Sequence, residues 1–499
     1  MMKKVFGLVS SLLLIGCAVQ SSKAISTEIQ VSHINTIDAK GMNAVEISAY
    51  CAKTQRLFTA STLYTGVLVF DISDVKNIKK VATIDISPYG GNVNSVAVSN
   101  GNIAMAIENS NRQENGFIVV YDTKSLKEIE VLEADALPDM LAYSPNGNYI
   151  ISANEGEPNN DYSIDPHGSV TIVDMENNIV TSVGFDDLSA IKIKKLKEKG
   201  LRIFGKNATF SKDAEPEYLT ISKDGKTAWV VLQENNAIAE IDIINAELKN
   251  ILPLGVKDFS LPENALDVSD VDGKIQLNTW ENLKGFYLPD AITNTVINGK
   301  TYIITANEGD SRDYAGFSEE IRVSDVVLDA QAFPNAKELQ QNDQLGRLKI
   351  TTTAGDIDND GDYDELYAFG TRSFSIWNTK GDLVYDSGND IAKQTQINPK
   401  AFNQNDTRSD DKGSEPEALA TLKLKGKTLL FVGLERTSGV LMYDISNPKK
   451  PIFLEWIQHK GDISPEGLFV IPAAVSPTGK NTLVVSNEIS GTISLFEIK

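Results

Sequence analysis

The sequence predicts an all-β protein, a single β-propeller of seven or eight blades with short helical inserts. Three observations lead to this prediction: strand and turn signals recur along the chain, each copy holds three or four short antiparallel strands, and no low-complexity linker divides the copies. Units of about 30–65 residues with this content are typical of propeller blades. A pair of β-sandwiches is the alternative, which the regularly recurring small turns disfavour.

The clearest copy of the repeat spans residues 215–242. It opens on Glu215-Pro216-Glu217, turns at Lys223-Asp224-Gly225, and continues through an apolar strand at 228–231 to a third strand at 239–242. An Asp-Gly turn between two apolar runs indicates an antiparallel hairpin. Further clear copies span 137–174, 414–444 and 464–496, and weaker ones span 43–73, 89–122, 286–350 and 362–386.

Two segments interrupt the repeats and predict short helices. Residues 187–199 are rich in lysine and begin with Asp187 and Ser189, either of which suits a helix N-cap. Residues 328–341 predict a second short helix. We therefore expect one domain over residues 31–499, with helical inserts.

Residues 1–16 predict a targeting segment rather than a part of the fold. Lys3 and Lys4 precede an apolar run that ends in Leu14-Ile15-Gly16-Cys17 and is too short to cross a membrane. This ending resembles a bacterial lipobox, which implies cleavage before Cys17 and lipidation of that cysteine. The alternative is a secretory signal peptide cut after Ala24.

The lipobox also predicts where the protein resides. After a signal peptide over 1–16, residues 17–30 would form a tether that carries the lipid on Cys17. Ala18 follows the lipidated cysteine, and in a Gram-negative host an Asp at that position would suggest inner-membrane retention. We therefore expect a bacterial cell-envelope protein at the outer membrane, which contacts the membrane through its N-terminal lipid only.

The composition fits a folded protein that binds cations. Of 499 residues, 41% are hydrophobic, which is enough for a large core. Asp and Glu number 68 against 47 Lys and Arg, which gives a formal charge of −21. Nucleic acid and anionic membrane surfaces need the opposite excess, so neither is expected as the main partner.

Cysteine and histidine are too few for soft-metal chemistry. Only Cys51 remains as a thiol after the predicted cleavage, so no intramolecular disulfide is expected. The three histidines, His33, His167 and His459, lie far apart in the sequence. Any bound metal is therefore expected to be a hard cation held by oxygen ligands.

A nine-residue acidic loop predicts a calcium site. Asp356-Ile357-Asp358-Asn359-Asp360-Gly361-Asp362-Tyr363-Asp364 places oxygen ligands on alternate residues, with glycine at the sharp turn. It resembles the calcium loops on β-hairpins of integrin-type propellers, because Tyr367 stands where an EF-hand has its bidentate acid and no helices flank the loop. The alternative is a solvated acidic turn. The predicted Ca²⁺ ligands are Asp356, Asp358, Asp360, Asp362 and Asp364.

A second acidic set is distributed over the repeats. Acids open the first strand of several units and others follow the second strand, and in an antiparallel pair these positions lie at the same sheet edge. We therefore predict an acidic mouth at one end of the central channel, with three arginines near it as candidate anion contacts. Inter-blade salt bridges are the alternative. The candidate mouth comprises Asp139, Glu155, Glu217, Asp290, Glu308, Glu417, Glu435, Glu466 and Glu488; the arginines are Arg312, Arg372 and Arg436.

Four of these segments resemble the choice-of-anchor I family, over roughly residues 31–498. They are Asn154-Glu155-Gly156-Glu157-Pro158, Ala214-Glu215-Pro216-Glu217, Asn307-Glu308-Gly309-Asp310-Ser311-Arg312 and Ser414-Glu415-Pro416-Glu417-Ala418. The resemblance implies an extracytoplasmic, propeller-like protein attached by one of several kinds of anchor. Some members are labelled alkaline phosphatase or phytase-like.

Two functions from different classes follow. The first is a calcium-binding propeller displayed at the cell surface as a ligand-binding or scaffolding module, with a small-molecule or surface ligand that the sequence does not name. The second is a calcium-dependent phosphoesterase, in which ions at the acidic mouth clamp phosphate oxygens and activate water. The chain has no G-x-S-x-G elbow, no G-x-x-x-x-G-K-[ST] loop and no plausible Ser-His-Asp set, which favours the first.

Overall fold

The computed structural model describes residues 28–499. The predicted signal peptide, the lipidation site Cys17 and most of the tether lie outside these residues, so the lipid anchor stays a prediction.

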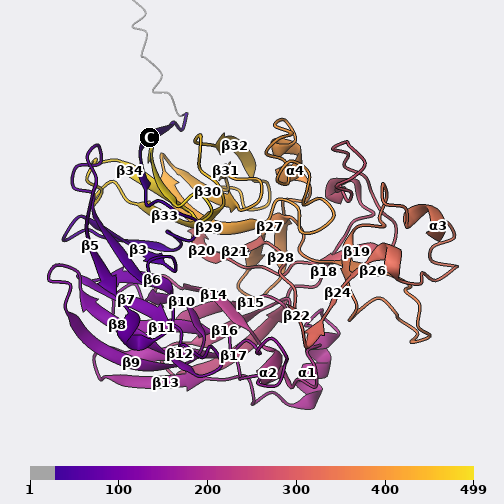
Figure 1. Ribbon diagram of the computed structural model, residues 1–499, viewed down its shortest axis with the longest axis horizontal. Helices are drawn as coiled ribbons and strands as arrows, with labels where there is room; N and C mark the ends of the chain where they lie inside the picture. Colours follow the sequence, from indigo (N-terminus) through magenta and orange to yellow (C-terminus); the bar gives the residue numbers. More distant parts are fainter. Residues whose placement is uncertain (1–27) are drawn as a thin grey trace, which may run out of the picture.

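Seven four-stranded antiparallel sheets make up most of the described chain (Figure 1). In six of them the strand order follows the chain, and in the seventh the N-terminal strand joins three C-terminal ones. The strands, sheet by sheet, are β2 (Ser48–Cys51), β3 (Arg56–Ser61), β4 (Gly66–Asp71) and β5 (Lys79–Asp85); β6 (Val93–Ser99), β7 (Asn102–Ile107), β8 (Asn115–Asp122) and β9 (Glu128–Ala136); β10 (Pro138–Tyr143), β11 (Tyr149–Asn154), β12 (Ser169–Asp174) and β13 (Ile179–Val183); β14 (Pro216–Ile221), β15 (Thr227–Leu232), β16 (Ala237–Asp242) and β17 (Glu247–Pro253); β20 (Ile292–Ile297), β21 (Lys300–Asn307), β27 (Ser373–Asn378) and β28 (Leu383–Asp386); β29 (Pro416–Leu424), β30 (Lys427–Leu434), β31 (Val440–Asp444) and β32 (Ile452–Ile457); β33 (Pro465–Ile471), β34 (Asn481–Asn487), β35 (Thr492–Ile498) and β1 (Val31–Asp38).

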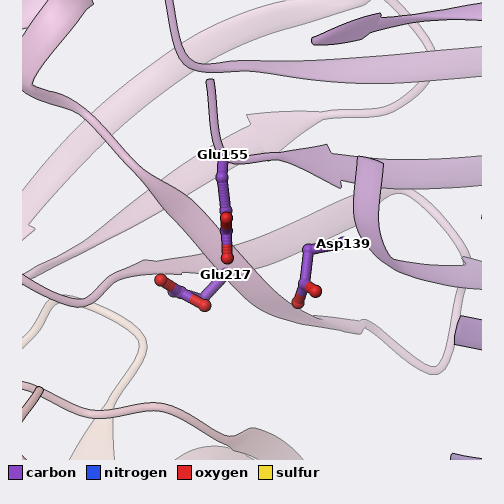
Figure 2. Close-up of side chains that lie close together, drawn as sticks. All are labelled: Asp139, Glu155 and Glu217. Carbon is purple, nitrogen blue, oxygen red and sulfur yellow. The ribbon is translucent and has the colours of Figure 1, made fainter. Parts of the chain in front are cut away.

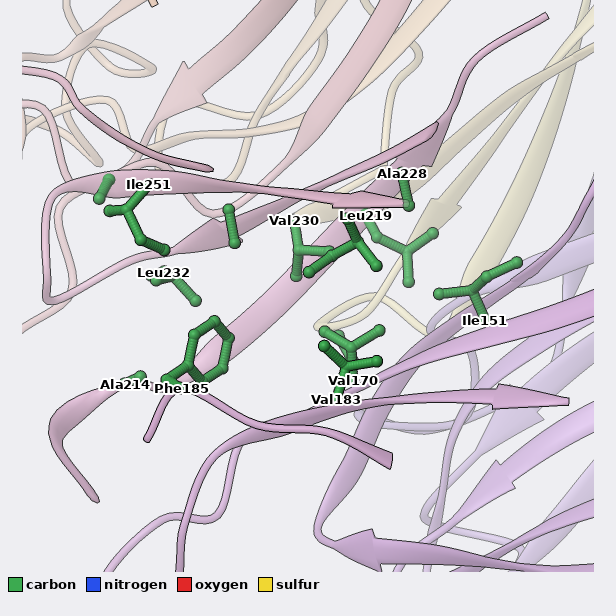
Figure 3. Close-up of a cluster of buried hydrophobic side chains, with 14 of the residues drawn as sticks. Ile151, Val170, Val183, Phe185, Ala214, Leu219, Ala228, Val230, Leu232 and Ile251 are labelled. Atoms are coloured by element: carbon green, nitrogen blue, oxygen red, sulfur yellow. The ribbon is translucent and has the colours of Figure 1, made fainter. Parts of the chain in front are cut away.

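Alternation along each central strand explains how the sheets pack. In β15, Ala228, Val230 and Leu232 face the sheet that begins with β10, whereas Trp229 and Val231 face the sheet that begins with β20. Both faces are apolar because a neighbouring sheet covers each of them. Figure 3 shows the first of these interfaces, in which side chains from the two sheets interdigitate.

The first strands of the seven sheets lie next to one another around the centre of the molecule. Each contacts the first strand of the following sheet, from β2 through β6, β10, β14, β20 and β29 to β33, and β33 contacts β2. Later strands of each sheet lie toward the periphery (Figure 1). The pairing of β1 with β35 brings the two ends of the described chain into one sheet. The fold is therefore all-β and propeller-like.

One predicted repeat boundary is wrong. Segments 286–350 and 362–386 were expected as separate units, but β21 pairs with β27, so β20, β21, β27 and β28 form a single sheet. Residues 308–372 are inserted between its second and third strands. Part of this insert joins residues 256–286 in a five-stranded sheet with its own apolar core, which includes Trp280 and Phe333. Its strands are β18 (Val256–Asp258), β19 (Leu283–Phe286), β26 (Leu366–Ala368), β25 (Lys349–Thr351) and β24 (Glu320–Arg322), and the small hairpin β22 (Asp313–Tyr314) and β23 (Phe317–Ser318) precedes β24.

The helices are short and lie between sheets. The predicted lysine-rich helix is present as α1 (Ala190–Lys197), and the Ser189 hydroxyl caps it by accepting the Lys192 amide. The second predicted helix is reduced to α3 (Ala336–Leu339). Over residues 28–499, no helix has the length and apolar character needed to cross a membrane. The remaining short helices are α2 (Phe210–Asp213), α4 (Asp390–Thr395), η1 (Ser87–Tyr89), η2 (Pro262–Asn264) and η3 (Val323–Asp325).

Candidate functional site

Strand register brings the two predicted acidic sets to the same end of each sheet. Pro138 pairs with Asn154, so Asp139 on β10 lies beside Glu155, which follows β11. Pro416 pairs with Leu434, which places Glu417 beside Glu435. Pro465 pairs with Asn487, which places Glu466 beside Glu488. The expected convergence of these acids within each sheet is therefore present.

In six of the seven sheets an acid lies on the first strand, or two residues before it, at the position equivalent to Asp139. We call these residues the inner acids: Glu46, Asp139, Glu217, Asp290, Glu417 and Glu466. Asn94 holds the seventh position. In the described part of the chain, none of the inner acids makes a salt bridge to a lysine, arginine or histidine. Four of them border one cavity of about 160 Å³: Glu46, Asp139, Asp290 and Glu466.

Burial and mutual repulsion make the inner acids weak acids. Burial, followed by the charges of neighbouring carboxylates, raises the pKa of Asp139 to about 7 and that of Glu466 to about 8. Burial likewise raises the pKa of Glu46 to about 7. For Glu217 and Glu417 the pKa lies well above the ordinary value, with burial as the largest cause. Near neutral pH, these groups must bind protons or cations.

Asp139, Glu155 and Glu217 form a compact group without a salt bridge within residues 28–499. One oxygen of each lies within 4.8 Å of the others, and Figure 2 shows the three carboxyl groups gathered in one space. Glu155 is only 9% exposed and makes no salt bridge to any described residue. Three hard oxygen donors from two neighbouring sheets, with no cation of the protein among them, are suited to a divalent ion such as calcium.

A second carboxylate group is neutralised by the protein itself. Glu308, Glu415 and Glu435 also converge, but Lys412 Nζ lies 2.8 Å from Glu308, and Arg436 lies 2.9 Å from Glu435 and 3.2 Å from Glu415. For Glu308, Glu415 and Glu435, the alternative interpretation of the acids as salt-bridge partners describes the contacts best.

Two of the three predicted anion contacts are engaged by other groups of the protein. Arg312 is almost fully buried, pairs with Asp213 and lies 3.0 Å from Glu215. Arg372 donates to three backbone carbonyls, those of Asp267, Ser409 and Asp411. Both guanidinium groups tie loops together, and Arg312 is also buried away from any anionic ligand.

Arg436, the third predicted anion contact, retains partial exposure, but its two salt bridges already engage it. The sequence prediction did not include Arg112, which borders the same cavity as Asp139 and pairs with Glu108 and Glu157 at 3.1 and 3.0 Å.

The predicted calcium loop connects β25 to β26 in the inserted sheet rather than two strands of a main sheet. Asp356, Asp358 and Asp360 gather their carboxylates within 4.8 Å. The Asp356 carboxylate accepts the amides of Asp360 and Gly361, both at 3.1 Å, and Gly361 has a φ of 101° that glycine adopts readily. The last two aspartates of the loop form a separate group with Asp329, which the sequence prediction missed: Asp329, Asp362 and Asp364.

Most of the missed residues come from outside the repeat pattern. Lys412 and Asp329 lie in inserts, whose path the repeats do not determine. Glu46 belongs to a repeat, but it lacks the preceding proline that marks Glu217 and Glu417, and alignment of its strand with β10 was the available signal.

Residues 46–448 match the model of the choice-of-anchor I domain, which is most of the chain. A mesenchyme-specific cell surface glycoprotein of Strongylocentrotus purpuratus is 28% identical over 331 residues, or 58% of this chain and 41% of that protein. Gigasin-3a of Magallana gigas is 29% identical over 191 residues, or 32% of this chain and 67% of gigasin-3a. The matched region thus spans less than half of the glycoprotein.

Solved structures resemble the fold. Hydrazine synthase of Kuenenia stuttgartiensis has a TM-score of 0.50 at 13% identity, covering 92% of this chain and 96% of that one. The β-propeller domain of Cps50 (Swd1) from Myceliophteria thermophila has a TM-score of 0.47 at 7% identity, covering 94% and 100%. At these identities the first likeness concerns the fold alone, and it agrees with the all-β architecture predicted from the sequence.

Proposed function

The chain belongs to the choice-of-anchor I family, and from that premise we propose that it is a cell-surface or extracellular propeller module whose inner acids bind divalent cations, calcium above all. The seven sheets would be the blades of a closed, seven-bladed propeller, and the ion-loaded end of its channel would recognise a small-molecule or surface ligand. The cell-surface glycoprotein among its relatives supports an extracytoplasmic location. A lipid on Cys17 would anchor the module in a bacterial outer membrane.

One observation carries the cation proposal. Six buried or half-buried carboxylates converge at the first strands, and in residues 28–499 no lysine, arginine or histidine forms a salt bridge with any of them. An uncompensated group of this kind costs free energy when ionised, and a bound divalent ion converts repulsion into attraction. Two of these acids, Asp139 and Glu217, offer with Glu155 three donor oxygens that lie within 4.8 Å of one another.

Calorimetric titration with calcium tests the proposal. The loop at 356–364 would bind calcium too, so the background for the test is Asp358→Asn with Asp360→Asn, which disables the loop. In that background we expect saturable calcium binding that Glu217→Gln weakens at least about tenfold, since a ligand charge is lost without a change of shape.

The matched control is Glu176→Gln, which removes an exposed acid from the turn between β12 and β13. Calcium binding that Glu217→Gln leaves unchanged in the loop-disabled background contradicts the proposal.

A phosphoesterase is the second candidate. Arg112 favours it, because this half-exposed arginine borders the cavity of the inner acids and would contact the phosphate oxygens of a metal-bound ester. Hydrolysis of p-nitrophenyl phosphate that requires calcium and disappears in Glu217→Gln would support an enzyme. Calcium binding without such hydrolysis would rule out the phosphoesterase and support the binding module.

A further inference from the structure

A cavity of about 480 Å³ lies between the 184–215 insert and the inserted five-stranded sheet, and none of the inner acids lines it. This volume suits a small organic ligand. We call it the aromatic pocket and define it by Lys197, Lys199, Arg202, Phe204, Phe286 and Tyr367, all of which line it. Nothing in the proposed cation site uses these residues.

The pocket is rigidly built where its two walls meet. Gly200 and Gly255 approach so closely that a Cβ on Gly200 would lie 2.8 Å from the Gly255 Cα. The buried Asn236 side chain donates to the carbonyls of both glycines, at 3.3 and 2.7 Å. A preformed wall of this kind lowers the entropic cost of ligand binding.

Three aromatic rings and the guanidinium group of Arg202 form the floor of the pocket. The Arg202 guanidinium lies between Phe204 and Phe286, 4.0 and 4.7 Å from their ring centroids. Tyr367 stacks on Phe286 with centroids 5.0 Å apart and an interplanar angle of 19°. Arg202 is held in place by Glu319 and by the carbonyl of Glu234, so the stack is ordered without a ligand. Phe286 is itself buried in this stack, so the half-buried rings of Phe204 and Tyr367 are the apolar surfaces that a planar molecule would contact.

The rim of the pocket carries Lys197 and Lys199 with Glu198 between them, which leaves one net positive charge in a chain with a net charge of −21. Lys197 and Lys199 are exposed, and neither forms a salt bridge with a described carboxylate. Lys197 reaches only the backbone carbonyl of Ile203, at 3.4 Å. Three further lysines precede them on α1: Lys192, Lys194 and Lys195. The local field therefore attracts anions, unlike the field of the inner acids.

From the cavity, its aromatic floor and its lysine rim, we propose that the aromatic pocket binds a small organic anion with a flat, aromatic body. The ring system would lie against Phe204 and Tyr367, and the anionic group would face Lys197 and Lys199.

Two probes that differ only in a sulfonate group test this assignment by calorimetry. Anilinonaphthalene sulfonate carries an aromatic body and a sulfonate, and N-phenyl-1-naphthylamine is the same body without the sulfonate. We expect one saturable site for the sulfonate. Lys197→Gln with Lys199→Gln should weaken it by about tenfold, while binding of the neutral probe changes by less than about twofold. The matched control, Lys223→Gln with Lys226→Gln, removes the same charge from an exposed turn elsewhere and should change neither.

Val256 supplies an independent pair of variants. It lines the pocket and is 40% exposed, so polar replacements are compatible with folding. Val256→Glu should weaken sulfonate binding and Val256→Gln should not, since only the former adds a negative charge. Failure to observe saturable sulfonate binding up to about 1 mM, or equal affinities for the parent, Lys197→Gln/Lys199→Gln and Val256→Glu, would overturn the proposal.

Discussion

Removing one inner acid should stabilise the protein at alkaline pH when calcium is absent. Glu466 is suited to this test because burial, followed by the charge of Glu488, raises its pKa from 4.5 to about 8. Between these two pH values the folded state binds more protons than the unfolded state, so the free energy of unfolding falls as pH rises. Glu466→Gln replaces the ionisable group with a neutral one of the same shape and removes this loss.

The size of the effect follows from the two pKa values. A difference from 4.5 to about 8 corresponds to roughly 5 kcal/mol at most, at about 1.4 kcal/mol per pH unit. The inner acids titrate together, so removing one lets its neighbours ionise more easily and shares the gain among them. We therefore expect Glu466→Gln to raise the free energy of unfolding by about 1–3 kcal/mol at pH 8.5 and by about a third of that at pH 5.5, which is less than about 1 kcal/mol.

Urea denaturation with a chelator present, followed by circular dichroism at both pH values, measures these differences. Glu176→Gln, the exposed control, should change the free energy of unfolding by less than about 0.5 kcal/mol at either pH. With saturating calcium the advantage of Glu466→Gln should shrink or reverse. A variant that is destabilised at pH 8.5 in the chelator, or equally stabilised at both pH values, refutes the reasoning.

Three further predictions concern other parts of the chain. Asp358→Asn with Asp360→Asn should abolish most of the stabilisation that calcium gives through the loop, which is about 2.7 kcal/mol at a calcium concentration of 100 times Kd and is measured as a rise in melting temperature. A parent protein whose melting temperature is the same with and without chelator contradicts the loop site. Arg312→Met should cost about 3–5 kcal/mol in urea denaturation, because it leaves Asp213 and Glu215 buried without their partner, and a loss below about 1 kcal/mol would show that this salt bridge is dispensable. Cys17→Ser should move the protein from the detergent phase to the aqueous phase, and unchanged partitioning rules out lipidation at this cysteine.

The repeated strands could be predicted because their signals are local. An Asp-Gly turn and alternating apolar residues determine a hairpin such as β14–β15 wherever it occurs. The pairing of β21 with β27 could not be predicted in this way, because a long insert between two strands costs little closure entropy and leaves no mark on the strands themselves. The expected eighth unit arose from this insert.

Some residues of the candidate site could likewise be predicted from local signals, and others could not. Asp139 and Glu217 could be placed because their repeat position sets their register. The partners that neutralise Glu308 and Glu415 could not, since Lys412 comes from an irregular segment of the chain. The roles of Arg312 and Arg372 depend on partners in the inserts and loops that surround them, which turn position alone does not reveal.

Anomalous diffraction from crystals soaked in terbium tests the cation site most directly, because Tb³⁺ replaces calcium at carboxylate sites and its scattering is unmistakable. We expect a peak among Asp139, Glu155 and Glu217, at about 2.3–2.6 Å from their oxygens, beside a second peak at the Asp356–Asp360 loop that serves as an internal control. Strong density at the loop, with none among the inner acids, would contradict the central proposal.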